Sequence, residues 1–168
     1  ASALAKPGDY VTCDLAEQPV IILRDHDNNL RAMSNVCRHR MSTLLSGRGS
    51  AKVIVCPYHA WTYNLDGSLR GAPAMNANKA FCKNQYRLPT IACEEWLGWV
   101  FINLNPDAKP VSKELVEVEQ LVKGYDMSNY SETFFEEHLW DTNWKILAEN
   151  FMESYHLPVC HAGTIGGL

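Results

Sequence analysis

Two short Cys/His pairs are the residues best suited to chemistry in this chain. Cys37 with His39, and Cys56 with His59, each supply one thiol and one imidazole, and sixteen residues separate the two pairs. A [2Fe-2S] cluster can be held by two thiolates on one iron and two imidazoles on the other, and the imidazoles raise its potential relative to an all-Cys cluster. The sequence therefore predicts a redox cluster with these four ligands.

Two other interpretations of the four residues stay open. A structural Cys2His2 zinc site uses the same donor types, although zinc fingers pair Cys with Cys and His with His in each half of the site. Free core cysteines beside surface histidines would require two matching motifs to arise by chance. The mixed pairs favour the cluster over both alternatives.

A second group of candidate ligands lies near the end of the chain. The stretch from Asn143 to His156 predicts a helix, and Pro158 prevents that helix from running far past Tyr155. A chain that turns there brings His161 back toward His156, so that both imidazoles could bind one metal. Two imidazoles and a carboxylate form the facial triad of mononuclear Fe(II), which leaves positions open for dioxygen.

Composition and charge exclude several classes of protein. The chain has 168 residues, of which 46% are hydrophobic and 20% charged, with a net charge of −4. These values indicate a globular chain of one domain or slightly more, without a basic block for nucleic acid or a run for a membrane span. Six cysteines without a secretory signal favour metal binding over disulfides and predict a cytoplasmic protein.

The pattern of elements predicts an α+β fold in two parts. Residues 1–106 read as an antiparallel β domain and residues 107–168 as the start of a second domain, with the linker Asn105–Pro110 at the boundary. A helix is expected over Glu114–Val122 and a strand over Thr133–Asp141. In the first part, short strands separated by turns are expected at Tyr10–Cys13, Pro19–Arg24, Leu30–Asn35, Val53–Cys56, Trp61–Asn64 and Trp96–Asn103.

The stretches Asn35-Val-Cys-Arg-His-Arg40 and Cys56-Pro-Tyr-His-Ala-Trp-Thr-Tyr63 resemble the large (alpha) subunit of the Rieske non-haem iron oxygenases. The resemblance continues through the string from Asn143 to His161. It implies a Rieske domain followed by a helix-grip-like catalytic domain, with a [2Fe-2S] cluster and a mononuclear Fe(II). The family's third iron ligand is a carboxylate farther downstream, so the chain is expected to be an internal piece of a longer subunit, inactive alone.

The resemblance also implies roles for single residues. Glu153 corresponds to the acidic residue that joins the mononuclear-iron His to a cluster His of the adjacent subunit, and Asn150 resembles the family's pocket-side Asn. Trp61 is expected to shield the cluster or to pack at a subunit interface, with an ordinary β-sheet aromatic as the alternative. The alternative for Glu153 is a solvent-facing helix carboxylate.

The expected function is that of a terminal oxygenase component. Electrons pass from the cluster to the mononuclear iron, which activates O2 to hydroxylate an aromatic or other small organic substrate, as in enzymes of class EC 1.14. One alternative is a ferredoxin-like electron carrier, and another is an oxidative demethylase or monooxygenase of small amines or quaternary ammonium compounds. The expected partners are a ferredoxin or NAD(P)H-dependent reductase and two further copies in a homotrimer.

Overall fold

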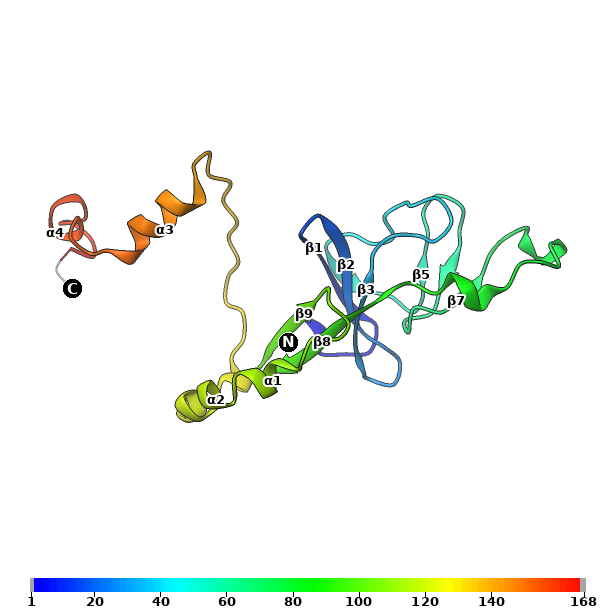
Figure 1. Ribbon diagram of the computed structural model, residues 1–168, viewed down its shortest axis with the longest axis horizontal. Coiled ribbons are helices and arrows are strands. Elements are labelled where there is room, and N and C mark those ends of the chain that lie inside the picture. The colour runs from blue at the N-terminus through cyan, green and yellow to red at the C-terminus, as the bar shows by residue number, and fades with distance from the viewer. Residues whose placement is uncertain (1, 167–168) are drawn as a thin grey trace. The chain divides into compact units, whose positions relative to one another are not determined.

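The computed structural model describes residues 2–166, without the side chains of residues 76 and 128. Two sheets dominate the first part of the chain (Figure 1). The larger sheet has six strands in the order β4-β1-β2-β3-β8-β9, and the smaller has three in the order β5-β6-β7. The strands are β1 Asp9–Leu15, β2 Gln18–Arg24, β3 Leu30–Ser34, β4 Arg48–Ser50, β5 Ile54–Val55, β6 Thr62–Tyr63, β7 Leu69–Gly71, β8 Thr90–Trp96 and β9 Trp99–Asn103.

Strand β2 is the centre of the larger sheet. It pairs antiparallel with β1 and β3, and its residues Val20, Ile21 and Leu23 are completely buried. A strand that is covered on both faces reads as a continuous apolar run, which is why Pro19–Arg24 was recognisable as a strand in the sequence.

The turn between β2 and β3 is organised by one buried carboxylate. Asp25 accepts hydrogen bonds from the backbone N–H groups of Asp27 and Asn29, and it forms an ion pair with Arg31 at 2.9 Å. Burial disfavours its ionisation, but the hydrogen bonds from Arg31 and Asn29 outweigh that effect and lower the pKa of Asp25. The charged side chain therefore holds the hairpin closed.

Strands β8 and β9 form a hairpin with a two-residue turn. Leu97 and Gly98 have φ values of 52° and 82°, and Trp96 pairs directly with Trp99. Two consecutive positive φ values are typical of the tight turns that match strand twist. The predicted strand Trp96–Asn103 is therefore divided by this turn: β9 covers Trp99–Asn103, and Trp96 ends β8, which begins at Thr90.

The apolar core lies where the two sheets meet the cluster loops. One group of buried side chains includes Ile21, Leu23 and Met33 from the larger sheet together with Cys37 and Cys56. Gly67, with φ 84°, closes the turn between β6 and β7 where a Cβ would lie 3.3 Å from the sulfur of Met33. The two candidate cysteines are thus fixed in the best-packed part of the molecule.

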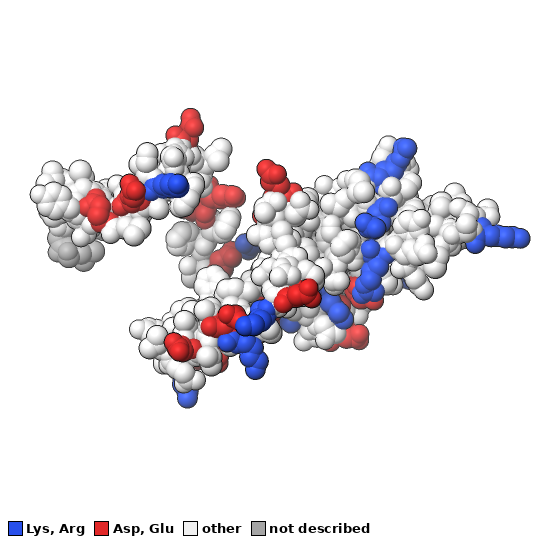
Figure 2. All heavy atoms as spheres, viewed as in Figure 1, with Lys and Arg blue, Asp and Glu red and all other residues white. Residues whose placement is uncertain are grey.

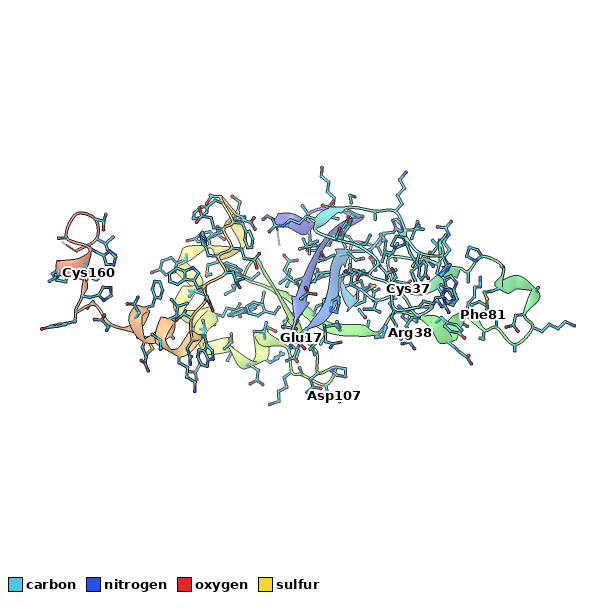
Figure 3. The ribbon with its side chains drawn as sticks, turned by 90° about the horizontal axis from the view of Figure 1, so that it is seen from above. Glu17, Cys37, Arg38, Phe81, Asp107 and Cys160 are labelled. Atoms are coloured by element: carbon cyan, nitrogen blue, oxygen red, sulfur yellow. The ribbon has the colours of Figure 1, made fainter. Side chains whose placement is uncertain are left out.

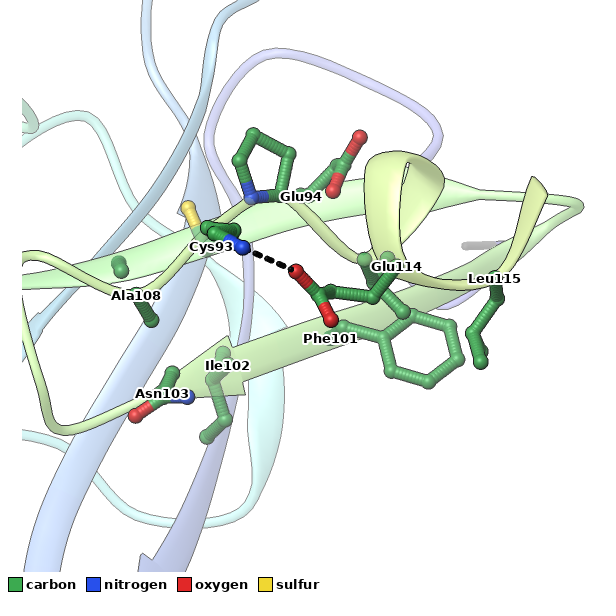
Figure 4. Close-up of a pocket in the computed structure, with 12 residues that line it drawn as sticks. Cys93, Glu94, Phe101, Ile102, Asn103, Ala108, Glu114 and Leu115 are labelled. Atoms are coloured by element: carbon green, nitrogen blue, oxygen red, sulfur yellow. Dashed lines mark ion pairs between the residues drawn. The ribbon is translucent and has the colours of Figure 1, made fainter.

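Short helices follow the sheets. The predicted helix Glu114–Val122 is divided at Leu115 into α1 and α2, and α1 and the linker lie beside the β8–β9 hairpin around a pocket of about 560 Å³ (Figure 4). The dashed line in Figure 4 is the ion pair between Lys109 and Glu114. The helical segments are η1 Ser2–Leu4, η2 Met75–Ala77, η3 Lys83–Tyr86, α1 Val111–Glu114, α2 Val116–Val122, η4 Lys123–Tyr125, η5 Met127–Asn129, α3 Trp144–Met152 and α4 Leu157–Cys160.

The chain divides into two compact units, residues 1–132 and residues 133–168. In the second unit, the strand predicted over Thr133–Asp141 is not formed. None of the described residues from 133 to 166 is buried, so this unit has no apolar core of its own to order a strand. The domain boundary predicted between residues 106 and 107 is not tested by this division and stays a prediction.

The helix predicted over Asn143–His156 is shorter in the structure. The Asn143 side chain accepts a hydrogen bond from the N–H of Lys145 and caps α3, which ends at Met152. Glu153 is extended, with φ −121° and ψ 153°, so the part of the predicted helix from Glu153 to His156 is not a continuation of α3. Pro158 lies in the first turn of α4, where a proline is tolerated because its missing N–H has no helical partner.

Candidate metal centre

The first cluster loop joins β3 to β4 and is held by its own backbone. The N–H of Cys37 donates to the carbonyl of Ser42, and the N–H of Met41 donates to the carbonyl of Cys37. Buried Asn35 stabilises the loop through two hydrogen bonds to Leu45. Its side-chain N–H donates to the carbonyl of Leu45, and its side-chain oxygen accepts from the N–H of Leu45. This network presents the segment from Cys37 to Met41 as a tight, preformed turn.

The second cluster loop joins β5 to β6 and has the same design. The N–H of Cys56 donates to the carbonyl of Trp61, and the N–H of Ala60 donates to the carbonyl of Cys56. Each loop closes on a residue in the left-handed region, with φ 57° at Met41 and 54° at Ala60. A non-glycine residue there is strained, so the tight closure is maintained at a cost to stability.

The fold sorts the four predicted ligands by chemical type. Cys37 and Cys56 are 1% and 3% exposed, whereas His39 and His59 are both exposed. The two imidazole rings lie with their centroids 4.8 Å apart, and the Cys37 side chain is close enough to Cys56 to lower the pKa of its thiol. Each loop therefore contributes its thiol to an inner pair and its imidazole to an outer pair.

Hydrogen bonds favour the thiolate form on the inner side. Burial raises the pKa of Cys56, but the backbone N–H groups of His59 and Tyr58 and the side chain of Cys37 act against it, and the net pKa lies below its ordinary value. A thiolate is the form that binds iron. Cys56 is thus favoured as a thiolate, the form suited to binding a metal.

Tyr63 is a site residue that the sequence analysis missed. Its hydroxyl accepts the N–H of Arg38 at 3.0 Å and lies 3.4 Å from the sulfur of Cys37, and its side chain is completely buried. Burial and the contact with Cys37 raise the pKa of Tyr63 well above its ordinary value, so the hydroxyl keeps its proton. Its position in the motif after Trp61, inside a strand, was the signal that it could point inward.

A two-iron cluster fits this donor set better than a single metal ion. A tetrahedral zinc site needs all four donors within about 2.0–2.3 Å of one ion. Two thiols on one side and two imidazoles on the other instead match the separate ligation of two irons.

Trp61 and the neighbouring rings support the outer pair. Its indole stacks on His39 with a centroid distance of 4.9 Å and an interplanar angle of 6°, and it is 3% exposed. Tyr58 packs on the ring of His59 at 3.8 Å. Figure 3 shows Cys37, Arg38 and Phe81 toward the same end of the first unit. The imidazoles are thereby held in orientation by aromatic contacts.

The second predicted group lies in the unit formed by residues 133–168. The rings of His156 and His161 have centroids 5.3 Å apart across α4, so the chain does return as predicted. His156 Nδ1 donates to Glu153 Oε1, and this bond lowers the pKa of Glu153. Asn150 lies on α3 one turn earlier and is exposed. The two imidazoles, on either side of α4, and their carboxylate partner thus lie together.

Comparison with known protein families identifies the chain. Residues 1–92 match the model of the Rieske [2Fe-2S] domain, and residues 109–167 match that of the ring-hydroxylating alpha subunit catalytic domain. The chain belongs to the Rieske non-haem iron oxygenases. The cofactors that these two domains imply are a Rieske [2Fe-2S] cluster and a mononuclear iron. The predicted α+β fold class is confirmed as well.

Several relatives of this Rieske oxygenase chain carry a substrate in their names. The chain is 40% identical to the carnitine monooxygenase oxygenase subunit of Acinetobacter pittii over 96% of this chain and 44% of that protein. It is 35% identical to the glycine betaine monooxygenase oxygenase subunit of Pseudomonas aeruginosa over 92% of this chain and 36% of that protein. It therefore spans less than half of these curated relatives.

A solved structure of a similar protein gives the same result in three dimensions. The quaternary ammonium Rieske monooxygenase CntA in complex with L-carnitine superposes with a TM-score of 0.83 at 39% identity, over 96% of this chain and 47% of that one.

No helix among residues 2–166 is long and apolar enough to cross a membrane.

Proposed function

We propose that this chain holds a Rieske cluster through Cys37 and Cys56 on one iron and His39 and His59 on the other. The observation that supports this ligand set is the sorting of the donors into a buried thiol pair and an exposed imidazole pair. When bound, the cluster supplies single electrons. The surrounding residues hold its ligands: Tyr63 would donate a hydrogen bond to the Cys37 thiolate, and Trp61 would fix the plane of His39.

We further propose that His156 and His161 bind the mononuclear iron and that Glu153 orients His156. A carboxylate hydrogen-bonded to a ligating imidazole fixes its tautomer and raises its basicity. By resemblance, Glu153 would also approach a cluster His of a neighbouring subunit in a homotrimer. Asn150 would then face the substrate side of the iron.

The proposed reaction of the complete protein is the monooxygenation of a small quaternary ammonium compound. Two relatives are named for carnitine and glycine betaine, and a solved neighbour contains L-carnitine. Hydroxylation of an aromatic ring is the second candidate reaction, and the name of the matched catalytic-domain family favours it. Electrons would come from NAD(P)H through a reductase or ferredoxin.

The test uses the full-length protein, purified without oxygen. We expect three irons and two sulfides per subunit, with the red colour of a Rieske cluster, and product from L-carnitine or glycine betaine only with O2 and a reductase. Naphthalene is the comparison substrate. Two irons per subunit without any product would instead support an electron carrier, and a colourless zinc protein would refute the cluster.

A further inference from the structure

Charge is divided sharply along this acidic chain. Residues 37–89, called the cluster lobe below, contain eight Lys or Arg and one Asp or Glu, whereas the rest of the chain contains seven Lys or Arg and eighteen Asp or Glu. The overall charge of −4 hides this division. A lobe with a net charge of +7 attracts acidic partners, and its field can steer their approach.

Most of the positive side chains on the lobe are not neutralised within the chain. Asp66, the one carboxylate of the lobe, is paired with Arg87, and Arg48 is paired with Glu132. Among residues 2–166 the structure shows no ion pair for the remaining six, which are Arg38, Arg40, Lys52, Arg70, Lys79 and Lys83. Figure 2 shows blue side chains predominating on the lobe, at the right of the view.

Three of these cations belong to the segment from β7 to η3. Lys83 Nζ donates to the backbone carbonyl of Arg70 at 3.3 Å, and Lys79 lies two residues before Phe81. All three side chains are exposed. We name Arg70, Lys79 and Lys83 the basic face.

An aromatic stack runs from the basic face to a cluster ligand. Phe81 and Tyr86 flank Lys83 in the sequence and are half-buried, with ring centroids 5.0 Å apart. Both meet the edge of Trp61, at 5.6 Å and 5.3 Å, and Trp61 stacks on His39. An unbroken set of ring contacts therefore joins this part of the surface to one of the imidazoles.

We propose that the basic face is the docking surface for an acidic electron-donor domain, and that electrons enter through Phe81, Tyr86 and Trp61 toward His39. This inference rests on the proposed function. An electron-donor domain is favoured over other acidic partners because Lys79 and Lys83 lie in the same short segment as Phe81 and Tyr86, the rings that lead to the cluster. In each encounter the donor's one-electron carrier is oxidised by one electron, the cluster is reduced by one, and no bond forms or breaks.

The experiment follows cluster reduction in the full-length holoprotein by stopped-flow absorbance. The probe is a reduced plant-type [2Fe-2S] ferredoxin with an acidic surface, and photoreduced deazaflavin serves as a small uncharged reductant. The rate with the ferredoxin should fall at least about tenfold as salt screens the charges, with the Debye length shortening from about 30 Å to about 3 Å. The deazaflavin rate should not depend on salt.

The decisive variant is K79E/K83E. At low salt, its reduction by the ferredoxin should be at least about tenfold slower than wild type and nearly independent of salt. The matched control K113E/K123E makes the same charge change at exposed lysines outside the lobe and should react almost like wild type. Deazaflavin should reduce all three proteins at one rate.

Several results would overturn the proposal. The proposal is wrong if the rate at which the ferredoxin reduces the wild-type cluster does not depend on salt. It is also wrong if K113E/K123E is slowed as much as K79E/K83E. If K79E/K83E changed the mass of the assembly in light scattering while its reduction rate stayed normal, the basic face would be a contact between copies. Failure of the proposed oxygenase function would appear as a lack of product. Cluster reduction needs neither O2 nor substrate, so the docking proposal would still be tested.

Discussion

The substitution Tyr63→Phe tests the electrostatic design of the centre. The hydroxyl of Tyr63 accepts the backbone N–H of Arg38, so its own proton is available to the Cys37 sulfur 3.4 Å away. Once Cys37 binds iron as a thiolate it has no proton to give, and Tyr63 must be the donor. A donor near the sulfur favours the reduced state of a cluster, which carries one more negative charge.

The magnitude follows from the worth of one hydrogen bond. A bond to a charged group contributes about 1.5–3 kcal/mol, and the added electron is shared over the whole cluster, so the difference between redox states is about 1 kcal/mol. At about 59 mV per tenfold change for one electron, Tyr63→Phe should lower the potential by about 45 mV. The N–H of Arg38 is left without an acceptor, which should destabilise the fold by about 1–3 kcal/mol.

The assay is a spectroscopic redox titration of the full-length protein beside chemical unfolding. The control is Tyr58→Phe, which removes a hydroxyl from a ring 57% exposed next to His59 and should leave both quantities almost unchanged. A potential that stays the same, or rises, in Tyr63→Phe would show that the hydroxyl does not donate to the ligand. Equal shifts in both variants would point to a general effect of ring polarity.

Three further changes probe separate parts of the structure. Ala60→Gly removes left-handed strain at φ 54° and should raise the free energy of unfolding by about 1 kcal/mol in urea titrations; a loss of stability would contradict the strained turn. Asp25→Asn weakens the bond to Arg31 and should cost about 1–3 kcal/mol at pH 7. Because the pKa of Asp25 is lowered in the folded state, its contribution to the free energy of unfolding is present above about pH 4 and is lost as pH falls through the folded pKa. The free energies of unfolding of wild type and Asp25→Asn should therefore converge in acid. A difference that stays constant with pH would refute this role of Asp25. Glu153→Gln should leave the cluster spectrum and its reduction intact while lowering product formation about 10- to 100-fold, and normal turnover would exclude a positioning role beside His156.

Local sequence was sufficient for features that depend on neighbours in the chain. The Cys/His spacings predicted both cluster loops, and the continuous apolar run predicted β2. Each of these features depends on a few consecutive residues, whose backbone preferences and polarity can be inferred without knowing their tertiary contacts. The family resemblance rested on the same short stretches.

Tertiary structure decided what depends on distant partners. Residues of the same type from the two loops lie together, with Cys37 near Cys56 and His39 near His59. This arrangement exists only because both loops are packed against one core. The end of α3 at Met152 and the absence of a strand over Thr133–Asp141 were equally invisible, since helix length and strand formation depend on surfaces elsewhere in the fold. Tyr63 became a site residue for the same reason: strand alternation allows an inward side chain, but only the packed sheet puts its hydroxyl beside a ligand.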